Sequence, residues 1–399
     1  MNAALHTESD AVARLAAARP MVVDVVPASE ISAHHAAGGV SHAGPPIEPE
    51  RMCPPMRAAL GSALWLEGVA ETPAAALALV EDGEIPLTTN HDAGGVGPMA
   101  GVVNPSMPVW VARDEATGKV AWCPLNEGSG AVLRYGADGP EVLERLIWMK
   151  DVLAPELRRA LDGAPLDLFD LHVQSIALGD EAHHRTEQGT ALTLDALGIE
   201  QPEVRAFIAG NGQFFLNLAM LFSKLALDCA ADVPGSPVLT AIARNGVEVG
   251  IRVSGLGDQW FVGPAALPAP AKLFPGYTPA DMNPDLGDSA IVETYGLGAL
   301  AVAASPISAP SVGLDVHAID AIDTELRAIA AGESPDIRFP DGRAAILGID
   351  ARKVAATRLS PPVHTGIAHK QPGIGQIGGG VTHPPLQAFD LAVQALDAR

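Results

Sequence analysis

QFFLNLAMLFSKLALDCA, residues 213–230, is the most apolar stretch of the chain. Its apolar side chains recur every three or four positions, as they do on the buried face of a helix: Phe214, Leu218, Leu221, Leu225 and Cys229. Phe215 and Phe222 form a second apolar face, so the spacing predicts one helix over 213–230 that is covered on two sides. Polar residues interrupt the run, which makes it too short and too polar to cross a bilayer.

The segments around this run also have helical apolar spacing and few glycines, at 141–152, 155–161, 191–197 and 203–208. They predict a helical unit over residues 140–233. On its N-terminal side, Met21–Val26 is typical of a strand, and Pro108–Ala112 and Val120–Cys123 predict two strands joined by a turn. We therefore expect an α+β fold with two glycine-rich mixed α/β lobes, 1–139 and 234–399, and the helical unit between them.

The C-terminal lobe contains a clear hairpin signal. Asn245-Gly246 is flanked by β-branched residues on both sides and predicts a two-residue turn, with both residues at positive φ, between 238–243 and 247–253. The proline-rich segment 262–287 indicates an extended excursion. Helices are expected over 290–304, 316–331 and 386–398.

Composition limits the kinds of partner. The 399 residues include 47 Asp and Glu against 25 Lys and Arg, a net charge of −22, and 4% are aromatic. This balance argues against nucleic acid and anionic membranes as partners, because both need a cationic surface. Three widely spaced cysteines without a CxxC pair are typical of reduced thiols, and an acidic N-terminus is unlike a signal peptide. We therefore expect a cytoplasmic protein without metal or cofactor.

Two short motifs give weak signals. Gly373-Ile-Gly-Gln-Ile-Gly378 matches the dinucleotide-binding pattern GxGxxG, but proline precedes it and more glycines and prolines follow, where the motif needs a strand and then a helix. Asp180, His183 and His184 are residue types of a carboxylate–histidine metal site. A polar helix start with hydrogen-bonded histidines is the favoured interpretation of that segment.

Residues 364–380 are the richest of several glycine-rich polar segments, with two histidines and Lys370. Such a backbone can form N–H nests around an anion, or it can simply make tight turns that pack elements closely. Both interpretations stay open. We expect 365–380 to line the main polar pocket and to meet the loops around His42 and Gly94–Gly97.

Taken together, these segments resemble the AllG-like (YlbE/YahG-like) family, long classed as a domain of unknown function. The resemblance runs from about residue 18 to the C-terminus, and it rests on His42–Pro46, Gly97–Met99, Leu125–Gly128, Arg134–Gly136, Gly179–Glu181, Gln213–Met220, Arg244–Gly246, Gly250–Gly257, Asn283–Asp285, Gly287–Ala290, Thr365–Lys370 and Gly373–Gly378.

The resemblance implies a subunit of a carbamoyltransferase complex that interconverts oxalurate plus phosphate with oxamate plus carbamoyl phosphate, in allantoin and purine catabolism. The implied partners are an FdrA-like subunit, itself similar to acyl-CoA synthetases, and a further small subunit; homodimerisation stays open. Two alternatives remain: the complex uses a different ureido or amide acceptor, or this chain is a non-catalytic scaffold whose FdrA-like partner holds the active site.

Such chemistry needs cations and N–H groups for phosphate, an arginine for a carboxylate, and a histidine to accept an amide proton. Residues of these types in glycine-rich segments are the candidates. We assign His369 and His42 to catalysis, and the following residues to substrate binding: Lys370, Arg134, Arg252, Arg244, Gly95, Gly97, Gly373 and Gly375.

Overall fold

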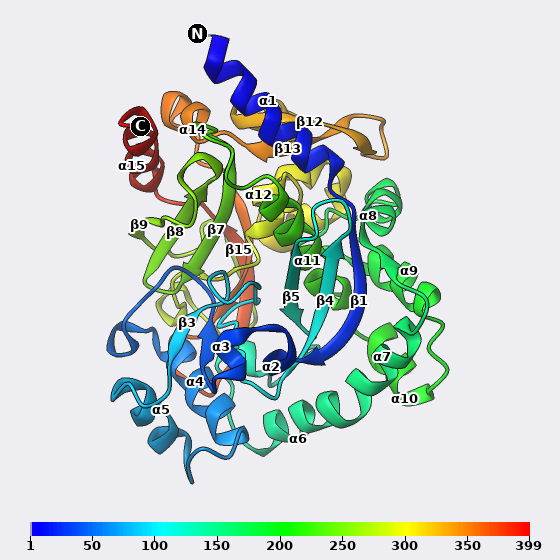
Figure 1. Ribbon diagram of the computed structural model, residues 1–399, viewed down its shortest axis with the longest axis vertical. Helices are drawn as coiled ribbons and strands as arrows, with labels where there is room; N and C mark the ends of the chain where they lie inside the picture. The colour runs from blue at the N-terminus through cyan, green and yellow to red at the C-terminus, as the bar shows by residue number, and fades with distance from the viewer. Residues whose placement is uncertain (1) are drawn as a thin grey trace.

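The computed structural model describes residues 2–399, and the side chains of residues 10–399. Its centre is α11, which packs against an antiparallel sheet of strand order β5-β4-β1-β6 (Figure 1). The bounds of these elements are Phe214–Cys229 for α11, Pro20–Pro27 for β1, Pro108–Asp114 for β4, Val120–Pro124 for β5 and Leu166–Asp167 for β6. The predicted helix and the predicted strand pair β4–β5 are confirmed.

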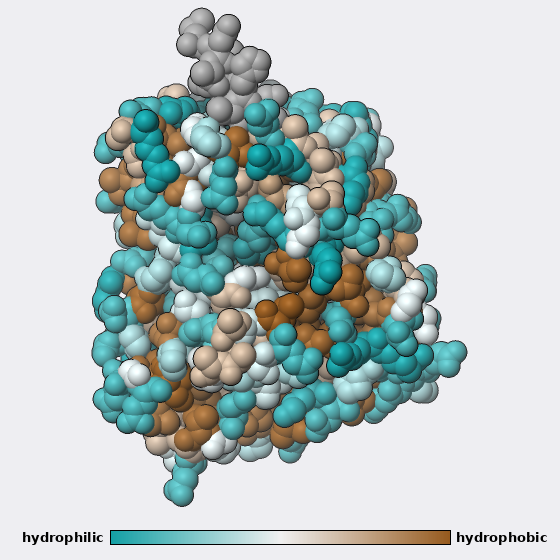
Figure 2. All heavy atoms as spheres, in the orientation of Figure 1, coloured by the Kyte–Doolittle hydropathy of each residue, from teal (hydrophilic) through white to brown (hydrophobic). Residues whose placement is uncertain are grey.

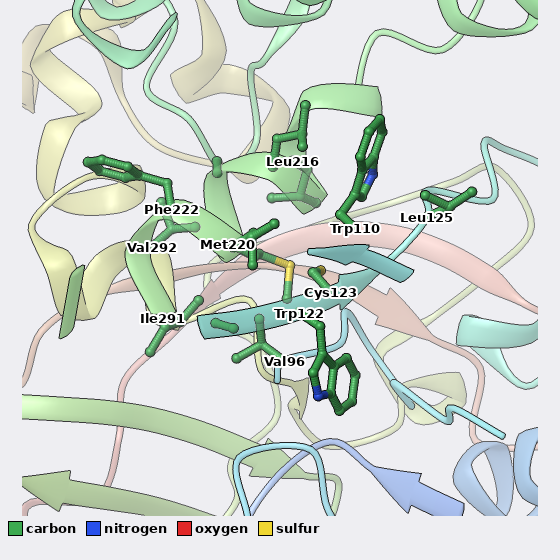
Figure 3. Packing of buried hydrophobic residues seen from close by; sticks show 14 of the residues in the cluster. Val96, Trp110, Trp122, Cys123, Leu125, Leu216, Met220, Phe222, Ile291 and Val292 are labelled. Atoms are coloured by element: carbon green, nitrogen blue, oxygen red, sulfur yellow. The ribbon is translucent and has the colours of Figure 1, made fainter. Parts of the chain in front are cut away.

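Helix α11 is buried on almost every side. All of its residues except Asp228 are buried, which agrees with two apolar faces. Figure 3 shows Met220 beside Cys123 of β5, while Trp122 points to the other side of the strand toward Val96. The polar side chains of Asn217 and Ser223 on α11 are also buried. Asn217 Nδ2 donates to the carbonyl of Pro124 at 2.7 Å. A buried amide of this kind is tolerated because its hydrogen bonds are made.

The middle segment contains five further helices within the described residues. They are α6 Pro140–Trp148, α7 Ala154–Leu161, α8 Leu168–Ala177, α9 Glu187–Leu197 and α10 Pro202–Ala209, with a π-helical turn at Met149–Leu153. Two of these helices, α8 and α9, pack directly against α11. Helix α8 was not predicted, although Asp167 caps it by accepting from the N–H of Asp170 at 3.0 Å. The expected helices at 141–152, 155–161, 191–197 and 203–208 are confirmed, although the first gives way to the π-helical turn after Trp148.

The N-terminal segment adds short elements around the first sheet. They are α1 Asn2–Ala17, α2 Ala28–Ile31, α3 Ala33–Ala36, β2 Val40–His42, α4 Pro54–Leu66, α5 Pro73–Glu81 and β3 Leu87–Thr89, with β2 and β3 paired in parallel. Figure 1 shows α1 at the opposite end of the molecule from α4 and α5, beside β12 and β13.

The C-terminal segment builds a second antiparallel sheet of order β11-β7-β8-β9. Its strands are β7 Leu239–Asn245, β8 Glu248–Val253, β9 Phe261–Pro264 and β11 Leu286–Gly287. The β7–β8 hairpin is confirmed, but the predicted turn conformation is wrong, because Gly246 has φ +80° whereas Asn245 is not in the left-handed region. The Asn245 side chain holds the turn instead, accepting from the N–H groups of Val247 and Glu248 at 3.0 and 2.7 Å.

The glycine-rich segment 364–380 is a β-hairpin rather than an open loop. Strands β14 Val363–Ala368 and β15 Gln376–Thr382 pair with each other, and β10 Ala271–Leu273 pairs with β15. The glycines permit close packing: a Cβ on Gly366 would lie 2.0 Å from the Tyr135 hydroxyl oxygen, and one on Gly378 would lie 2.4 Å from the Lys272 carbonyl oxygen. The segment 262–287 thus supplies short strands to two sheets.

Two expected helices are only partly formed. The stretch 290–304 breaks into α12 Ile291–Tyr295 and a 3-10 helix at Gly298–Ala304, because Gly296 has φ +118° and its backbone lies against β13. The stretch 316–331 is helical only as α13 Ile319–Leu326 with a 3-10 turn at each end, and from Ala330 it becomes a strand. The remaining elements are β12 Ala330–Arg338, β13 Ala344–Ile349, α14 Ala351–Thr357 and α15 Leu386–Asp397, the last of which confirms the C-terminal helix.

The structure confirms the α+β class, and one apolar cluster runs from Ala11 to Ala368 through all three predicted segments. Figure 2 shows a largely hydrophilic face with apolar side chains gathered in its middle, over β1 and β4. Within residues 2–399 no single helix is long and apolar enough to cross a membrane; α10 and α11 meet the criterion only as a pair bent by 76°.

Phe222 provides a test of the packing around α11. Its fully buried ring lies 4.2 Å from the ring of His172 and 4.9 Å from that of Tyr295, centroid to centroid. Phe222→Ala should lower the free energy of unfolding by about 3–5 kcal/mol, measured by urea denaturation. The reason is that the substitution leaves a cavity that the surrounding buried side chains cannot fill. Leu178→Ala, at a side chain 58% exposed, should change it little. Equal effects of the two variants would contradict this description.

Candidate active site: a cationic pocket lined by three histidines

A cavity of about 470 Å³ lies where the N-terminal, middle and C-terminal segments meet. Its walls come from the loop after Gly97, the 3-10 turn at Leu133–Tyr135, the segment between α8 and α9, strand β10, and the β14–β15 hairpin. The polar and charged residues that line it are Arg134, Tyr135, His183, His184, Gln213, Lys272, Ser289, Ser311, His364, Thr365 and Gln376.

His183 forms a tight pair with Glu293 of α12. Its Nδ1 lies 2.8 and 2.9 Å from the two carboxylate oxygens, and Glu293 is fully buried. The same carboxylate accepts from the N–H groups of Ala299 at 2.9 Å and His364 at 3.2 Å. A carboxylate held by this many donors is a fixed acceptor, so it fixes both the tautomer and the orientation of the His183 ring.

His364 of β14 forms a second pair, with Glu181. Its Nδ1 lies 3.3 Å from Glu181 Oε2, and both side chains are buried. Burial opposes protonation of His364, but the Glu181 carboxylate raises the pKa of this imidazole above its ordinary value. Burial likewise opposes ionisation of Glu181, but the neighbouring imidazoles, His364 first, lower its pKa to about 2. The Glu181 carboxylate therefore favours the charged form of the buried His364 ring.

The third imidazole, His184, differs from the other two. Its Nε2 lies 2.5 Å from the Ser311 hydroxyl oxygen, and its backbone N–H donates to Glu181. Burial lowers the pKa of His184 to about 4, so its ring is neutral at physiological pH. The ring centroids of His183 and His184 lie 6.3 and 5.9 Å from that of His364, which places three imidazoles around one space.

Arg134 and Lys272 supply full positive charges to the same cavity. Arg134 donates to the Asn126 side-chain oxygen at 3.4 Å and to the Gly128 carbonyl at 2.6 Å, and Lys272 is exposed on β10. No salt bridge to either side chain occurs within residues 10–399, and none of the residues lining the cavity there is Asp or Glu. In a chain with a net charge of −22, the described side chains that line this cavity therefore present positive but no negative formal charge.

The wall at Thr365 is supported from behind by an ion pair. Thr365 Oγ1 donates to Asp285 at 2.9 Å, and Asp285 in turn accepts from Arg244 Nε at 2.9 Å. Arg244 is fully buried and also donates to the Gly287 carbonyl, so its guanidinium faces Asp285 rather than the cavity. The sequence placed Arg244 among the substrate-binding residues; the structure places it one layer behind the pocket.

Of the predicted site residues, Arg134 lines this cavity. Arg252 pairs with Asp92 and Asp258 and lies 4.2 Å from the ring centre of Trp260, away from the pocket. His42 lines a separate cavity of about 390 Å³, and burial lowers its pKa to about 4.

The tip of the β14–β15 hairpin carries four more predicted residues outside the cavity. Lys370 is exposed, and His369 is buried with its Nδ1 accepting from the N–H of Gln371 at 2.9 Å. Gly373 and Gly375 form the turn, with φ +83° and +95°. The glycine-rich segment does reach the pocket, but through its strands, at Thr365, Gly366, Gln376, Gly378 and Gly379.

Gly95 and Gly97 pack the loop that precedes the pocket wall. A Cβ on Gly95 would lie 2.2 Å from the Trp122 ring, and the N–H of Gly97 donates to Asp288 at 3.0 Å. Pro98 and Met99, directly after them, line the cavity. The roles assigned to these glycines and to the residues outside the cavity stay predictions.

Sequence reasoning did not assign His364, Lys272, Glu181 and Glu293 to the site. His183 and His184 were noted only as metal-site residue types, and within residues 10–399 no group of three or more His, Cys, Asp or Glu side chains is placed to hold a metal ion. The one local signal was the run Asp180-Glu-Ala-His-His184, which concentrates carboxylates and imidazoles in a short segment. That segment is not a helix start, since α9 begins at Glu187.

The fold and the pocket define an α+β protein with a cavity lined by an arginine, a lysine and histidines that carboxylates support, a lining that suits a small anionic ligand. Residues 85–289 match the family described as Oxamate carbamoyltransferase subunit AllG. The chain is 41% identical over 395 residues, 95% of its length and 94% of the relative's, to an Escherichia coli (strain K12) protein named Oxamate carbamoyltransferase subunit AllG.

A second Escherichia coli (strain K12) relative, named Uncharacterized protein YahG, is 37% identical over 401 residues, 96% of this chain and 84% of that protein. A crystal structure titled as a conserved protein of unknown function from Enterococcus faecalis V583 superimposes with a TM-score of 0.96 at 39% identity, covering 99% of this chain and 98% of that one. The chain belongs to the AllG family, as its sequence segments indicated.

The His364–Glu181 pair predicts a specific response to pH. Glu181→Gln should lower the pKa of His364 below the ordinary 6.5, because burial remains while the carboxylate is gone. The titration of the imidazole Cε1–H signals in NMR spectra measures this, and the signal of His172, whose pKa burial lowers to about 4, is the internal control.

The same variant should be less stable by about 3–5 kcal/mol where both groups are charged. Because the pKa of Glu181 is lowered in the folded protein, this contribution is lost as the pH falls from about 4.5 toward 2. Because the pKa of His364 is raised in the folded protein, the contribution is also lost as the pH rises from 6.5 through the raised pKa of His364. Glu293, His183 and His184 also face His364, so a pKa that stays raised in Glu181→Gln would assign the shift to Glu293.

Proposed function

We propose that this chain is a subunit of a carbamoyltransferase, and that the cavity binds carbamoyl phosphate and the carbamoyl acceptor. The observation that carries the proposal is the lining of the cavity: Arg134, Lys272 and three histidines, with no acidic side chain, in a strongly acidic chain. The similarity to a relative named as an oxamate carbamoyltransferase subunit supplies the reaction class.

The chemistry of the substrates fits this lining. Carbamoyl phosphate is a dianion and oxamate is a carboxylate, so both require cations and N–H donors. Arg134 and Lys272 provide positive charge to the cavity, and the Glu181 carboxylate favours the charged form of the His364 ring. We infer that the reaction interconverts oxalurate plus phosphate with oxamate plus carbamoyl phosphate.

The proposal includes a hetero-oligomer with an FdrA-like subunit and a further small subunit. Two features support an assembly: the word subunit in the relative's name, and apolar side chains on an open face of the first sheet, where Val23 of β1 is 36% exposed.

The test is to co-express the chain with the products of its neighbouring genes and to measure the phosphate-dependent breakdown of oxalurate. The expected result is oxamate and carbamoyl phosphate in equal amounts. Activity on another ureido compound but not on oxalurate would show that the carbamoyl acceptor is not oxamate, in agreement with the alternative of a different acceptor. Failure of the isolated chain to bind carbamoyl phosphate, together with an active complex, would favour the scaffold alternative.

Lys272 and Lys370 distinguish the pocket from the hairpin tip as the anion site. Lys272→Ala should weaken carbamoyl phosphate binding by about 10- to 100-fold in isothermal titration calorimetry, since it removes a charged donor from the cavity. Both lysines are exposed, so each substitution to alanine should leave the melting temperature within a few degrees. If Lys370→Ala abolishes binding while Lys272→Ala does not, the phosphate binds at the hairpin tip, as the sequence first suggested.

A further inference from the structure

We propose that His183 is the general base of the pocket, and that Glu293 is the residue that positions it. This inference rests on the proposed function. It assigns to His183 Nε2 the proton that the acceptor amide nitrogen loses when it is carbamoylated.

The first support is the geometry of the pair. Both carboxylate oxygens of Glu293 lie within 2.9 Å of His183 Nδ1, so Nδ1 carries the hydrogen and donates it. The lone pair of the ring is then on Nε2, which has no hydrogen-bond partner within the described residues, and His183 lines the cavity. A carboxylate, an imidazole and an open Nε2 form the arrangement that makes a histidine an oriented proton acceptor.

The second support is how firmly this pair is held. Glu293 also accepts from the N–H groups of Ala299 and His364, and a Cβ on Gly298 would lie 2.2 Å from its Oε1. Its carboxylate therefore cannot turn away from Nδ1 without losing hydrogen bonds in a buried environment.

The third support is backbone strain next to His183. Ala182 has φ +75°, and Met99, which lines the same cavity, has φ +55°. A non-glycine residue in the left-handed region is strained and persists only where the surroundings impose it. The left-handed conformation of Ala182 directs the side chains of its two neighbours to different partners. Glu181 contacts His364, and His183 contacts Glu293.

The other two imidazoles are less suited to accept a proton. His184 Nε2 is engaged by Ser311, and burial lowers the pKa of this ring to about 4. His364 Nε2 is itself buried and has no hydrogen-bond partner among the described residues, so it is less accessible to a ligand than His183 Nε2. His364 instead suits the negative charge that develops on the carbonyl or phosphate oxygens.

The proton then has a complete path. The amide nitrogen of oxamate attacks the carbonyl carbon of carbamoyl phosphate, and a C–N bond forms while the C–O bond to phosphate breaks. Inorganic phosphate leaves with the electron pair of that bond, the proton of the nitrogen moves to His183 Nε2, and the imidazolium then passes this proton to the phosphate, which departs as hydrogen phosphate. In the reverse direction, the imidazolium returns this proton to the oxamate nitrogen as phosphate attacks oxalurate.

The test uses the assembled complex with His183→Ala. We expect kcat for oxalurate breakdown to fall by about 10²- to 10⁴-fold with KM within a few-fold, because the proton transfer through His183, which in this direction donates the proton, occurs in the transition state and not in binding. Carbamoyl phosphate affinity, measured by calorimetry, should be nearly unchanged. Added imidazole should restore part of kcat in His183→Ala, but not in a variant of the anion site, Lys272→Ala.

Glu293→Gln tests the positioning role and provides a second variant if His183→Ala does not fold. It keeps the size of the side chain and should lower kcat more than it changes KM, and added imidazole should not rescue it because the native ring is still present. His317→Ala, at an exposed histidine outside the cavity, is the control and should leave kcat unchanged. The melting temperature of each variant checks its fold.

The outcomes separate the two proposals. If the wild-type complex does not act on oxalurate or any ureido acid, the proposed function fails, and this inference fails with it. If the wild-type complex is active and folded His183→Ala and Glu293→Gln retain full kcat, the function stands and His183 is not the base. If kcat falls equally in His183→Ala and His317→Ala, the loss is not specific to the pocket and the inference is overturned.

Discussion

The buried carboxylate of Glu293 is the constraint on which the site depends. An ionised carboxylate in the interior is costly unless donors surround it. Here the donors come from three separate places: His183 in the segment between α8 and α9, Ala299 in the 3-10 helix after α12, and His364 on β14. To satisfy one charge, the chain has to bring these segments to one point, and that point is the back wall of the cavity.

The pocket also shows how a strongly acidic chain produces a positive site. It does not remove acidic residues from the region; it places them one layer behind the surface that faces the ligand. Glu181 and Glu293 each support an imidazole, and Asp285 pairs with Arg244 behind Thr365. The carboxylates fix the orientation of their partners, while Arg134 and Lys272 have no salt bridge within residues 10–399 and keep their charge available to the cavity. This arrangement is preorganised for an anion, since the donors need not rearrange when a ligand enters.

The sequence predicted features that depend on local periodicity and failed for those that depend on contacts between distant segments. Helix α11 and the β7–β8 hairpin follow from spacing and from Asn-Gly, and both exist. Even there, the turn conformation was missed, because a buried Asn245 side chain substitutes for the positive φ that its residue type suggested. An arginine such as Arg244 can bind a carboxylate ligand, but the tertiary structure shows that its guanidinium already pairs with the carboxylate of Asp285.

The function of the glycine-rich segment 364–380 also depends on contacts between distant segments, which the sequence does not reveal. Composition left two interpretations open, N–H nests for an anion or close packing, and the strands of the hairpin favour the second at Gly366, where the Tyr135 hydroxyl leaves no room for a Cβ. Close packing is nevertheless what creates the site, because it allows β14 and β15 to lie against Tyr135 and β10 and so brings His364, Thr365 and Lys272 to one cavity. Larger residues at these positions would push the strands apart and separate the imidazoles from the cations. In this fold the glycines of the two strands shape the cavity through the close approach that they permit between neighbouring segments, and Gly366, Gly378 and Gly379 lie within the β14–β15 ladder.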